Sequence, residues 1–237
     1  MSEVLLKVDD LSVGYGDFMA VHGVSFEIIE GEIVSIIGSN GAGKSTLMKA
    51  VGGVVAPKSG KIMYKDKDIT GWAPHKIVEL GISTVPEGGK VFGRMTVKDN
   101  LLMGSYPKRA RKNASRSLER VYDLFPMLKE KSNDLSASLS GGQRQMVAIG
   151  RVLMSEPELI ILDEVSLGLA PTIIKDIYAT VRRISADGAT IILVEQDVKR
   201  SLKTSSRAYV MLKGEVKLSG VSHELDEEDV RKAYFGV

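Results

Sequence analysis

The chain has 237 residues, of which 43% are hydrophobic and 26% are charged, as in an ordinary soluble protein with a full hydrophobic core. Its 32 Lys and Arg against 30 Asp and Glu give a formal net charge of +2, which is too balanced to indicate nucleic-acid binding. The sequence contains no cysteine, which excludes disulfides and thiolate metal sites. Its three histidines, His22, His75 and His223, are too scattered to indicate a metal-ligand cluster.

The hydropathy pattern gives no sign of a secretory or membrane-spanning segment. Residues 1–10 alternate charged and aliphatic side chains, unlike the basic start and apolar run of a signal peptide. No stretch approaches the roughly 18 apolar residues of a spanning helix. We therefore expect a cytoplasmic protein that does any membrane work through another polypeptide.

The first part of the chain predicts the start of a parallel α/β sheet. Residues 5–8 and 24–28 alternate in polarity, whereas 33–37 is aliphatic apart from Ser35, typical of a strand buried on both faces. A glycine-rich turn and a helix over 44–51 follow, as in a βα unit. The further elements expected in this part are strands at 61–64 and 82–85 and a helix over 75–80.

Between residues 96 and 154 the strand signal disappears, which predicts an all-helical insertion in the sheet domain. We expect helices over 96–104, 113–124 and 141–154, with Pro126 ending the second and a polar loop over 132–140 preceding the third. This part also holds a basic cluster, interpreted as a solvated helix start rather than a partner site: Lys108, Arg109, Arg111, Lys112, Arg116 and Arg120.

The sheet pattern resumes in the last third of the chain. Strands are expected at 159–162, 190–194, 209–212 and 215–219, with helices over 172–184 and 227–233. The whole chain, 1–237, is therefore predicted to form one α/β domain. Its core comprises residues 1–95 and 155–237, with a small antiparallel β subdomain near the N-terminus, and residues 96–154 form an inserted helical subdomain.

The strongest functional signal is a glycine-rich loop between a buried strand and a helix. It fits the phosphate-binding pattern of P-loop NTPases, in which the backbone wraps around phosphate and the helix start faces the anion. Lys44 would reach the β- and γ-phosphates, and the Ser45 hydroxyl would hold Mg²⁺. The residues expected to bind nucleotide here are Gly38, Ser39, Asn40, Gly41, Ala42, Gly43, Lys44, Ser45 and Thr46.

A second signal is the aliphatic run 159–162 followed by Asp163 and Glu164. In a parallel sheet these carboxylates lie at the carboxyl end of a strand, beside the phosphate loop. Asp163 is suited to lie just outside the direct ligands of the metal, and Glu164 can accept a proton from the attacking water. Without the phosphate loop, the same pattern would more often be a strand that enters a turn.

A third signal is Leu139-Ser140-Gly141-Gly142-Gln143. Ser140 is a suitable N-cap, and the two glycines leave bare N–H groups at the start of the following helix. In isolation, an ordinary capped helix start and an anion site are equally good interpretations of this pentapeptide.

Together, in this order, the three motifs resemble the ABC ATPase family along essentially the whole chain. The resemblance implies a RecA-like P-loop core and two copies arranged head to tail. ATP would lie between the phosphate loop of one copy and Ser140–Gln143 of the other. It also implies that Tyr15 stacks on adenine, the alternative being an ordinary tyrosine in a turn.

Three positions depart from the usual family pattern. Glu87 replaces the glutamine after strand 82–85, and Gln196 replaces the switch histidine after strand 190–194. Glu87 can still bind Mg²⁺ or water, and Gln196 can donate a hydrogen bond to γ-phosphate but cannot become cationic. The D-loop position falls at 166–171, and its usual aspartate is replaced in Gly168-Leu169-Ala170-Pro171, which leaves its cross-subunit contact in doubt.

These departures, and a tail ending in Ala-Tyr-Phe-Gly, resemble the ATP-binding subunits of bacterial and archaeal importers for branched-chain amino acids. Val165 stands where that branch usually has proline. The resemblance implies a second ATPase subunit, identical or related, with permease subunits and, indirectly, a substrate-binding protein at the cytoplasmic face of the membrane. Importers of urea and short amides remain an alternative. A non-transport ABC protein is disfavoured because this chain has one cassette, and a non-hydrolysing module is disfavoured because Glu164 is present.

Overall fold

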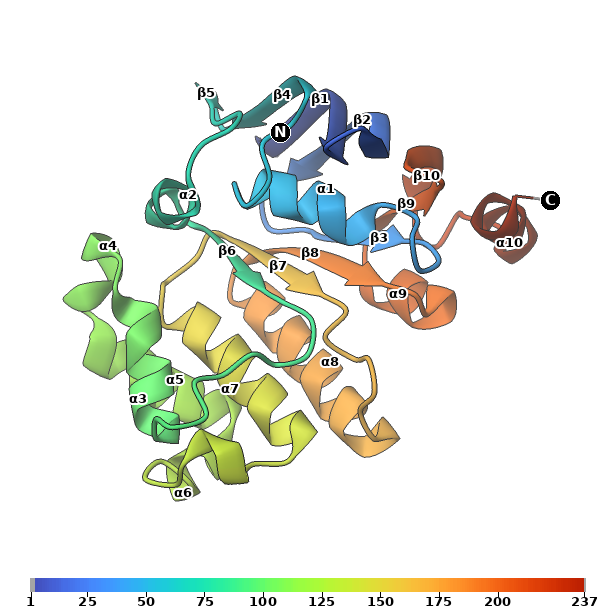
Figure 1. Cartoon of the computed structure of the whole chain (residues 1–237). Coiled ribbons are helices and arrows are strands. Elements are labelled where there is room, and N and C mark those ends of the chain that lie inside the picture. The colour runs from blue at the N-terminus through green and yellow to red at the C-terminus, as the bar shows by residue number, and fades with distance from the viewer. Residues whose placement is uncertain (1–2, 237) are drawn as a thin grey trace.

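The computed structural model describes residues 3–236, in which the strands form two sheets (Figure 1). The smaller sheet is antiparallel, with the strand order β2-β1-β4-β5. Its strands are β1 (Val4–Tyr15), β2 (Phe18–Ile29), β4 (Ser59–Tyr64) and β5 (Lys67–Asp68). The antiparallel portion near the N-terminus expected from the sequence is therefore present, with longer strands than predicted and the unpredicted β5.

The larger sheet has the order β10-β9-β3-β8-β7-β6, and all its neighbours are parallel except β9 and β10. Its strands are β3 (Ile33–Ile37), β6 (Ile82–Val85), β7 (Leu159–Asp163), β8 (Thr190–Glu195), β9 (Arg207–Leu212) and β10 (Glu215–Val221). Every residue of β3, β7 and β8 is buried. Their predominantly aliphatic sequences fit this position, because both faces of the sheet are covered.

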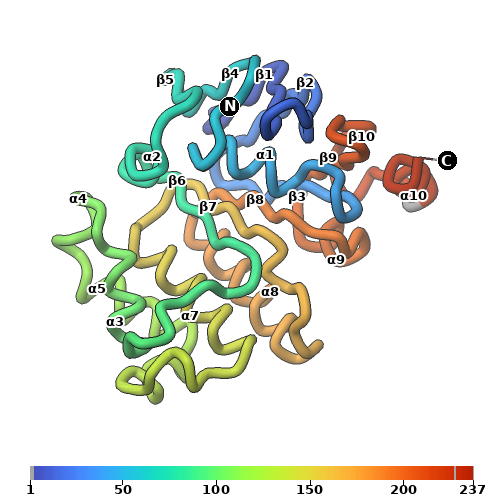
Figure 2. The backbone as a smooth tube through the Cα atoms, viewed as in Figure 1, coloured from blue at the N-terminus to red at the C-terminus, as the bar shows by residue number. Residues whose placement is uncertain are grey.

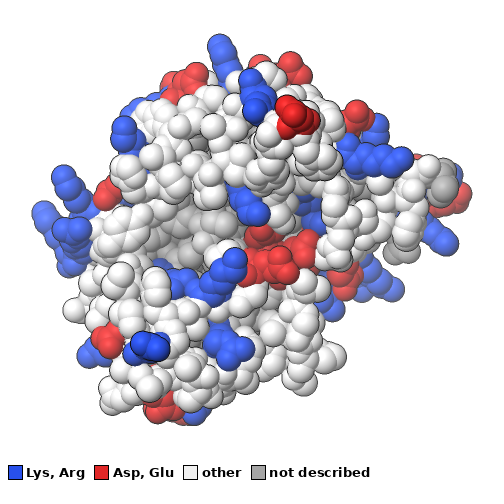
Figure 3. Space-filling model, in the orientation of Figure 1, with Lys and Arg blue, Asp and Glu red and all other residues white. Residues whose placement is uncertain are grey.

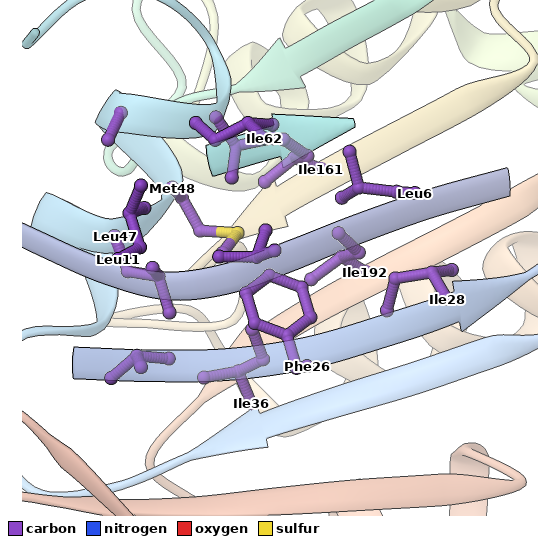
Figure 4. Close-up of a cluster of buried hydrophobic side chains, with 14 of the residues drawn as sticks. Leu6, Leu11, Phe26, Ile28, Ile36, Leu47, Met48, Ile62, Ile161 and Ile192 are labelled. Atoms are coloured by element: carbon purple, nitrogen blue, oxygen red, sulfur yellow. The ribbon is translucent and has the colours of Figure 1, made fainter. Parts of the chain in front are cut away.

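Alternate residues of the central strands face two different hydrophobic cores. Ile161 and Ile192 pack with Leu6, Phe26 and the helix α1 (Lys44–Val51), between the two sheets (Figure 4). Ile160 and Leu193, on the other face, pack with α7 (Gly141–Leu153) and α8 (Pro171–Ala186). The molecule thus has a central parallel sheet between an antiparallel sheet with α1 and a layer of helices.

The chain between β6 and β7 contains helices, loops and one isolated β-bridge, Thr96 with Leu135, and lies along one side of the central sheet (Figures 1 and 2). Besides α7 it contains α3 (Val97–Leu102), α4 (Lys108–Arg111), α5 (Ala114–Leu124), α6 (Pro126–Glu130) and 3₁₀ turns at Met103–Ser105 and Ser136–Ser138. The helix expected over 96–104 is shorter, because its last turn is 3₁₀. Pro126 ends one helix and begins another, since proline is tolerated in the first turn of a helix.

Arg109 corrects the interpretation of the basic cluster as a wholly solvated helix start. Its guanidinium donates hydrogen bonds to the backbone oxygens of Val78 (2.6 Å), Glu79 (2.7 Å) and Ser155 (2.8 Å). Val78 and Glu79 lie in the last turn of α2 (Pro74–Leu80), where helix carbonyls lack partners within the helix. Arg109 therefore ties the helical segment to two parts of the sheet domain.

Two further helices complete the fold. The sequence did not predict α9 (Val198–Thr204), a short helix whose N-cap Asp197 accepts a hydrogen bond from the Arg200 N–H. The last helix, α10 (Glu227–Phe235), lies at the edge of the molecule near β9 and β10 (Figure 2). No helix among residues 3–236 has the length and apolar character required to cross a membrane.

The strand order determines where the functional loops meet. Strands β3, β8, β7 and β6 are successive neighbours and run in the same direction. Their carboxyl ends lead to Gly38, Gln196, Glu164 and Glu87, respectively. Loops that are far apart in the sequence are thereby placed along one edge of the sheet, the usual position of ligand sites in such folds.

Candidate functional site

The glycine-rich loop between β3 and α1 has a backbone that other residues could not adopt. A Cβ atom at Gly38 would lie 2.5 Å from the backbone oxygen of Met211. Gly43, which precedes α1, has φ +97°, and a Cβ there would lie 2.5 Å from the oxygen of Ala20. The glycines thus permit a closely packed loop that leads directly into α1. The backbone N–H groups of such a loop and of the helix start can bind an anion.

This loop lines a cavity of about 390 Å³. The cavity wall also includes Glu87, from the loop after β6, and two residues after β7, Glu164 and Leu167. The phosphate-loop residues in the wall are Asn40, Gly41, Ala42, Gly43, Lys44, Ser45 and Thr46. Figure 3 shows acidic atoms gathered near the centre of this face, below α1. The structure therefore brings the first two sequence motifs and Glu87 together.

Lys44 holds a central position in the cavity. Its Nζ lies 3.1 Å from Glu164 Oε1 and donates to the backbone oxygen of Ser39 at 3.1 Å. The Lys44 and Glu164 side chains are only 3% and 8% exposed. The pair lies where solvent screens charges weakly, so both groups are sensitive to any further charge brought into the cavity.

Ser45 and Asp163 form the second close pair. The Ser45 hydroxyl donates to Asp163 Oδ1 at 3.0 Å. Burial raises the pKa of Asp163, and the negative charges of Glu164 and Glu87 raise it further against the opposing effects of Ser45 and Lys44. Asp163 thus lies among the charges of Glu164, Glu87 and Lys44, but the described residues contain no group of three or more His, Cys, Asp or Glu that could by itself hold a metal ion.

Glu164 itself has a strained backbone. Its φ is +47°, in the left-handed region that residues with side chains seldom occupy. Gln196, directly after β8, donates from Nε2 to Glu164 Oε2 at 2.6 Å. Lys44 and Gln196 therefore hold the Glu164 carboxylate from two sides. Backbone strain of this kind is often found at functional sites.

Ser140 forms the N-cap of α7, as the sequence predicted. Its hydroxyl accepts from the Gln143 N–H at 3.3 Å, and Gln143 Oε1 accepts from the Ser140 N–H at 2.9 Å. A Cβ atom at Gly142 would lie 2.6 Å from Ile173 Cγ2 of α8. Of the described residues, 140–143 are not among those lining the phosphate-loop cavity. Figure 1 shows the start of α7 well away from α1.

Comparison with known proteins decides the family. The protein-family model described as "ABC transporter" matches residues 21–166. The chain belongs to the ABC transporter family. It is 42% identical to the high-affinity branched-chain amino acid transport ATP-binding protein BraG of Pseudomonas aeruginosa, over 98% of this chain and 100% of that protein. It is also 32% identical to a probable branched-chain amino acid transport ATP-binding protein of Archaeoglobus fulgidus, over 98% of this chain and 99% of the relative.

Solved structures agree with this assignment. The chain resembles a crystal structure of the ADP conformation of an ATP-binding cassette of an ABC transporter, with a TM-score of 0.84 and 28% identity. The match covers 98% of this chain and 94% of the other. The fold class and the family expected from the sequence are confirmed. This ABC protein is an ATP-binding, ATP-hydrolysing subunit.

The exposed side chains of this ABC ATPase include two aromatic ones on the β1–β2 hairpin and that of Leu167. Tyr15 is 47% exposed, and Phe18, its register partner across the β1–β2 hairpin, is 70% exposed. Neither residue is among those lining the phosphate-loop cavity, so the stacking of Tyr15 on adenine stays a prediction. Leu167, which is 52% exposed and lines the cavity, lies within the expected D-loop at 166–171, but the sequence indicated no role of its own for it.

Proposed function

We propose that this chain is the ATP-hydrolysing subunit of an importer for branched-chain amino acids. The observation that supports it most is the 42% identity with BraG, which extends over 98% of this chain and 100% of BraG. Both curated relatives described above are named for transport of branched-chain amino acids. The alternative of a urea or short-amide importer is therefore not favoured.

ATP would bind with its phosphates in the cavity of the glycine-rich loop. Lys44 would contact the β- and γ-phosphates, and the N–H groups at the start of α1 would face the same anion. Ser45 and Asp163, already joined by a hydrogen bond, would hold Mg²⁺, with Glu87 on the same cavity wall. Mg²⁺ binds few protein ligands alongside water and phosphate oxygens, and it would neutralise phosphate charge.

Hydrolysis would proceed by attack of a water oxygen on the γ-phosphorus, with cleavage of the bond to the β-phosphate oxygen. Glu164 would accept the water proton, and ADP would leave with its β-phosphate oxygen negative. The hydrogen bond from Gln196 orients the Glu164 carboxylate. The Gln196 amide can also donate to the γ-phosphate, but it carries no positive charge.

A second subunit would complete the site. Ser140, Gly141, Gly142 and Gln143 are remote from the cavity of their own chain, so they would bind the γ-phosphate of ATP held by a partner subunit. The capping box leaves the N–H groups of Gly141 and Gly142 without side-chain partners, which suits an anion. Exposed Tyr15, with Phe18 beside it, would stack on adenine.

The membrane partner would dock in an apolar hollow between the sheet domain and the helical segment. This hollow, of about 310 Å³, includes Phe92, Met103 and Tyr106, which are 50%, 48% and 43% exposed. Figure 3 shows it as largely uncharged surface between α2 and α4. It also borders the loop that carries Glu87, so a permease segment seated there would connect the ATP site with the membrane. Such docking would make the chain peripheral to the cytoplasmic face, with a substrate-binding protein as an indirect partner.

Uptake of labelled leucine by cells whose only copy carries Glu164→Gln tests the proposal. We expect uptake to be lost while the protein level stays the same. Phe92→Asp should abolish uptake while leaving ATP hydrolysis by the purified subunit intact. Val54→Asp, at a 65% exposed position outside the hollow, should leave both uptake and hydrolysis unchanged. If leucine uptake persists but labelled urea uptake disappears in the Glu164→Gln cells, the substrate assignment is wrong.

A further inference from the structure

Glu195 is a buried carboxylate beside the ATP site that no step above uses. It is the last residue of β8 and is 3% exposed. Its Oε1 accepts a hydrogen bond from the Tyr178 hydroxyl at 2.8 Å, and its Oε2 accepts one from the Ser166 hydroxyl at 3.0 Å. Both donors are neutral groups, which makes burial of the charge expensive.

The cost of burying this charge is reflected in the pKa of Glu195. Burial raises the pKa of Glu195 above its ordinary value, and the hydrogen bonds from Tyr178 and Ser166 oppose the shift. The nearby charge of Glu164 raises the pKa further. An apolar side chain of similar size would avoid this cost, so stability alone does not explain a carboxylate here.

The position of Glu195 gives it contact with three loops of the site. Its backbone oxygen accepts from the N–H of Gly38, the first residue of the phosphate loop, at 3.4 Å. The next residue along the chain is Gln196, which donates to Glu164. Ser166, held by the Glu195 side chain, comes two residues after Glu164. The carboxylate thus joins the segment that carries Gln196 to the segment that carries Glu164.

We propose that Glu195 is a positioning residue for ATP hydrolysis, which holds Ser166 and Tyr178 so that Glu164 and Gln196 keep one mutual geometry. Displacements of about 1 Å at a reacting group can cost about 10²-fold in rate. A buried network in which every polar group is hydrogen-bonded is rigid and would prevent such displacements. Through Ser166 the same network fixes the start of the loop 166–170, which leads into α8 and carries Leu169 against Gly141. The inference rests on the proposed roles of Glu164 and Gln196.

The test is the steady-state ATPase of purified Glu195→Ala. We expect kcat to fall about tenfold or more while KM for ATP stays within about threefold, because the contacts of Lys44 and the phosphate loop are unchanged. Glu195→Gln should recover most of the loss, since its amide can still bond to both hydroxyls. Glu32→Ala is the matched control: this carboxylate is 11% exposed and pairs with Arg207 at the opposite end of the same sheet. Its removal should leave kcat unchanged.

A double-mutant comparison separates positioning from general damage. Ser166→Ala should lower kcat, and adding it to Glu195→Ala should cause no further loss, because both changes break one interaction. The proposal is overturned if Glu195→Ala keeps the wild-type kcat, if KM rises in parallel, or if the two losses multiply. Should Glu195→Ala not fold, Ser166→Ala and Tyr178→Phe remove the donors singly, and wild-type kcat in both would overturn it.

A different result would contradict the proposed function. If Glu164→Gln hydrolyses ATP at the wild-type rate, the role of Glu164 is wrong. If Glu164→Gln is inactive and Glu195→Ala is fully active, only the positioning role of Glu195 is wrong.

Discussion

The Nζ atom of Lys44 lies 3.1 Å from Oε1 of Glu164, with both side chains almost completely buried. The group that would bind the phosphates of ATP is therefore ion-paired with the group that would accept the proton of the attacking water. Phosphate oxygens compete for the same ammonium, so binding of ATP would weaken the hold of Lys44 on Glu164. The carboxylate would then be available as a base while Gln196 keeps it in place.

Lys44→Ala should lower the affinity for Mg²⁺-ATP by about 10- to 150-fold, because a hydrogen bond to a charged group contributes about 1.5–3 kcal/mol. Isothermal titration calorimetry measures this directly. Lys49→Ala, at an exposed position of the same helix, should bind ATP like the wild type. Equal affinities for Lys44→Ala and Lys49→Ala would remove Lys44 from the phosphate site.

Asp163→Asn should stabilise the nucleotide-free protein at neutral pH while it lowers ATPase activity. Burial raises the pKa of Asp163 above its ordinary value of 3.8, so the folded state disfavours the charged form. Wild-type stability therefore falls as pH rises through that raised pKa, and the advantage of asparagine should shrink as pH falls toward 4. For a domain of this size, about 1 kcal/mol shifts Tm by about 2–4 °C. Thermal unfolding at several pH values tests this, and a lower Tm for Asp163→Asn at pH 7.5 would contradict it.

Substitutions of Gln196 should separate hydrogen bonding from charge. Gln196→His should keep turnover or raise it, because an imidazole N–H can replace the amide as donor to Glu164. Gln196→Glu places a second carboxylate at the 2.6 Å contact and should lower kcat by about 10²-fold, as loss of an aligned donor typically does. Phosphate release by the folded variants is the measurement. An inactive but folded Gln196→His would show that Gln196 is not the switch position.

Arg109→Ala should destabilise the fold by about 1–3 kcal/mol, since it leaves the carbonyls at the end of α2 without their charged donor. Arg111→Ala should have little effect, because Arg111 is exposed and its side chain donates to Tyr106 of a neighbouring turn. Denaturant unfolding of the two variants compares them. Equal stabilities would mean that the contacts of Arg109 contribute nothing net.

The sequence predicted the elements of the site because each depends on local chemistry. Predominantly aliphatic runs identified β3, β7 and β8. The phosphate loop requires glycine at Gly38 and Gly43 because a Cβ atom at either position would collide with a backbone oxygen. The parallel order of these strands then places Glu87, Glu164 and the loop at one cavity.

What the sequence could not predict depends on tertiary packing. Arg109 looked like part of a solvated basic run because its carbonyl partners belong to segments distant in the chain. The contacts of Glu195 with Tyr178 and Ser166 likewise arise only when β8, α8 and the loop after β7 come together. Helix α9 has too few residues for a clear amphipathic period.

The most direct test of the central claim is phosphate release from ATP by purified Glu164→Gln beside the wild type, with nucleotide binding measured on the same samples. We expect the rate to fall by about 10²–10⁴-fold, the usual contribution of a positioned general base. ATP should still bind, and size-exclusion chromatography with ATP should show a stable dimer. Glu130→Gln, an exposed carboxylate in α6, serves as the control and should hydrolyse ATP normally. Wild-type turnover by Glu164→Gln, or a monomer that binds ATP without associating, would contradict the account.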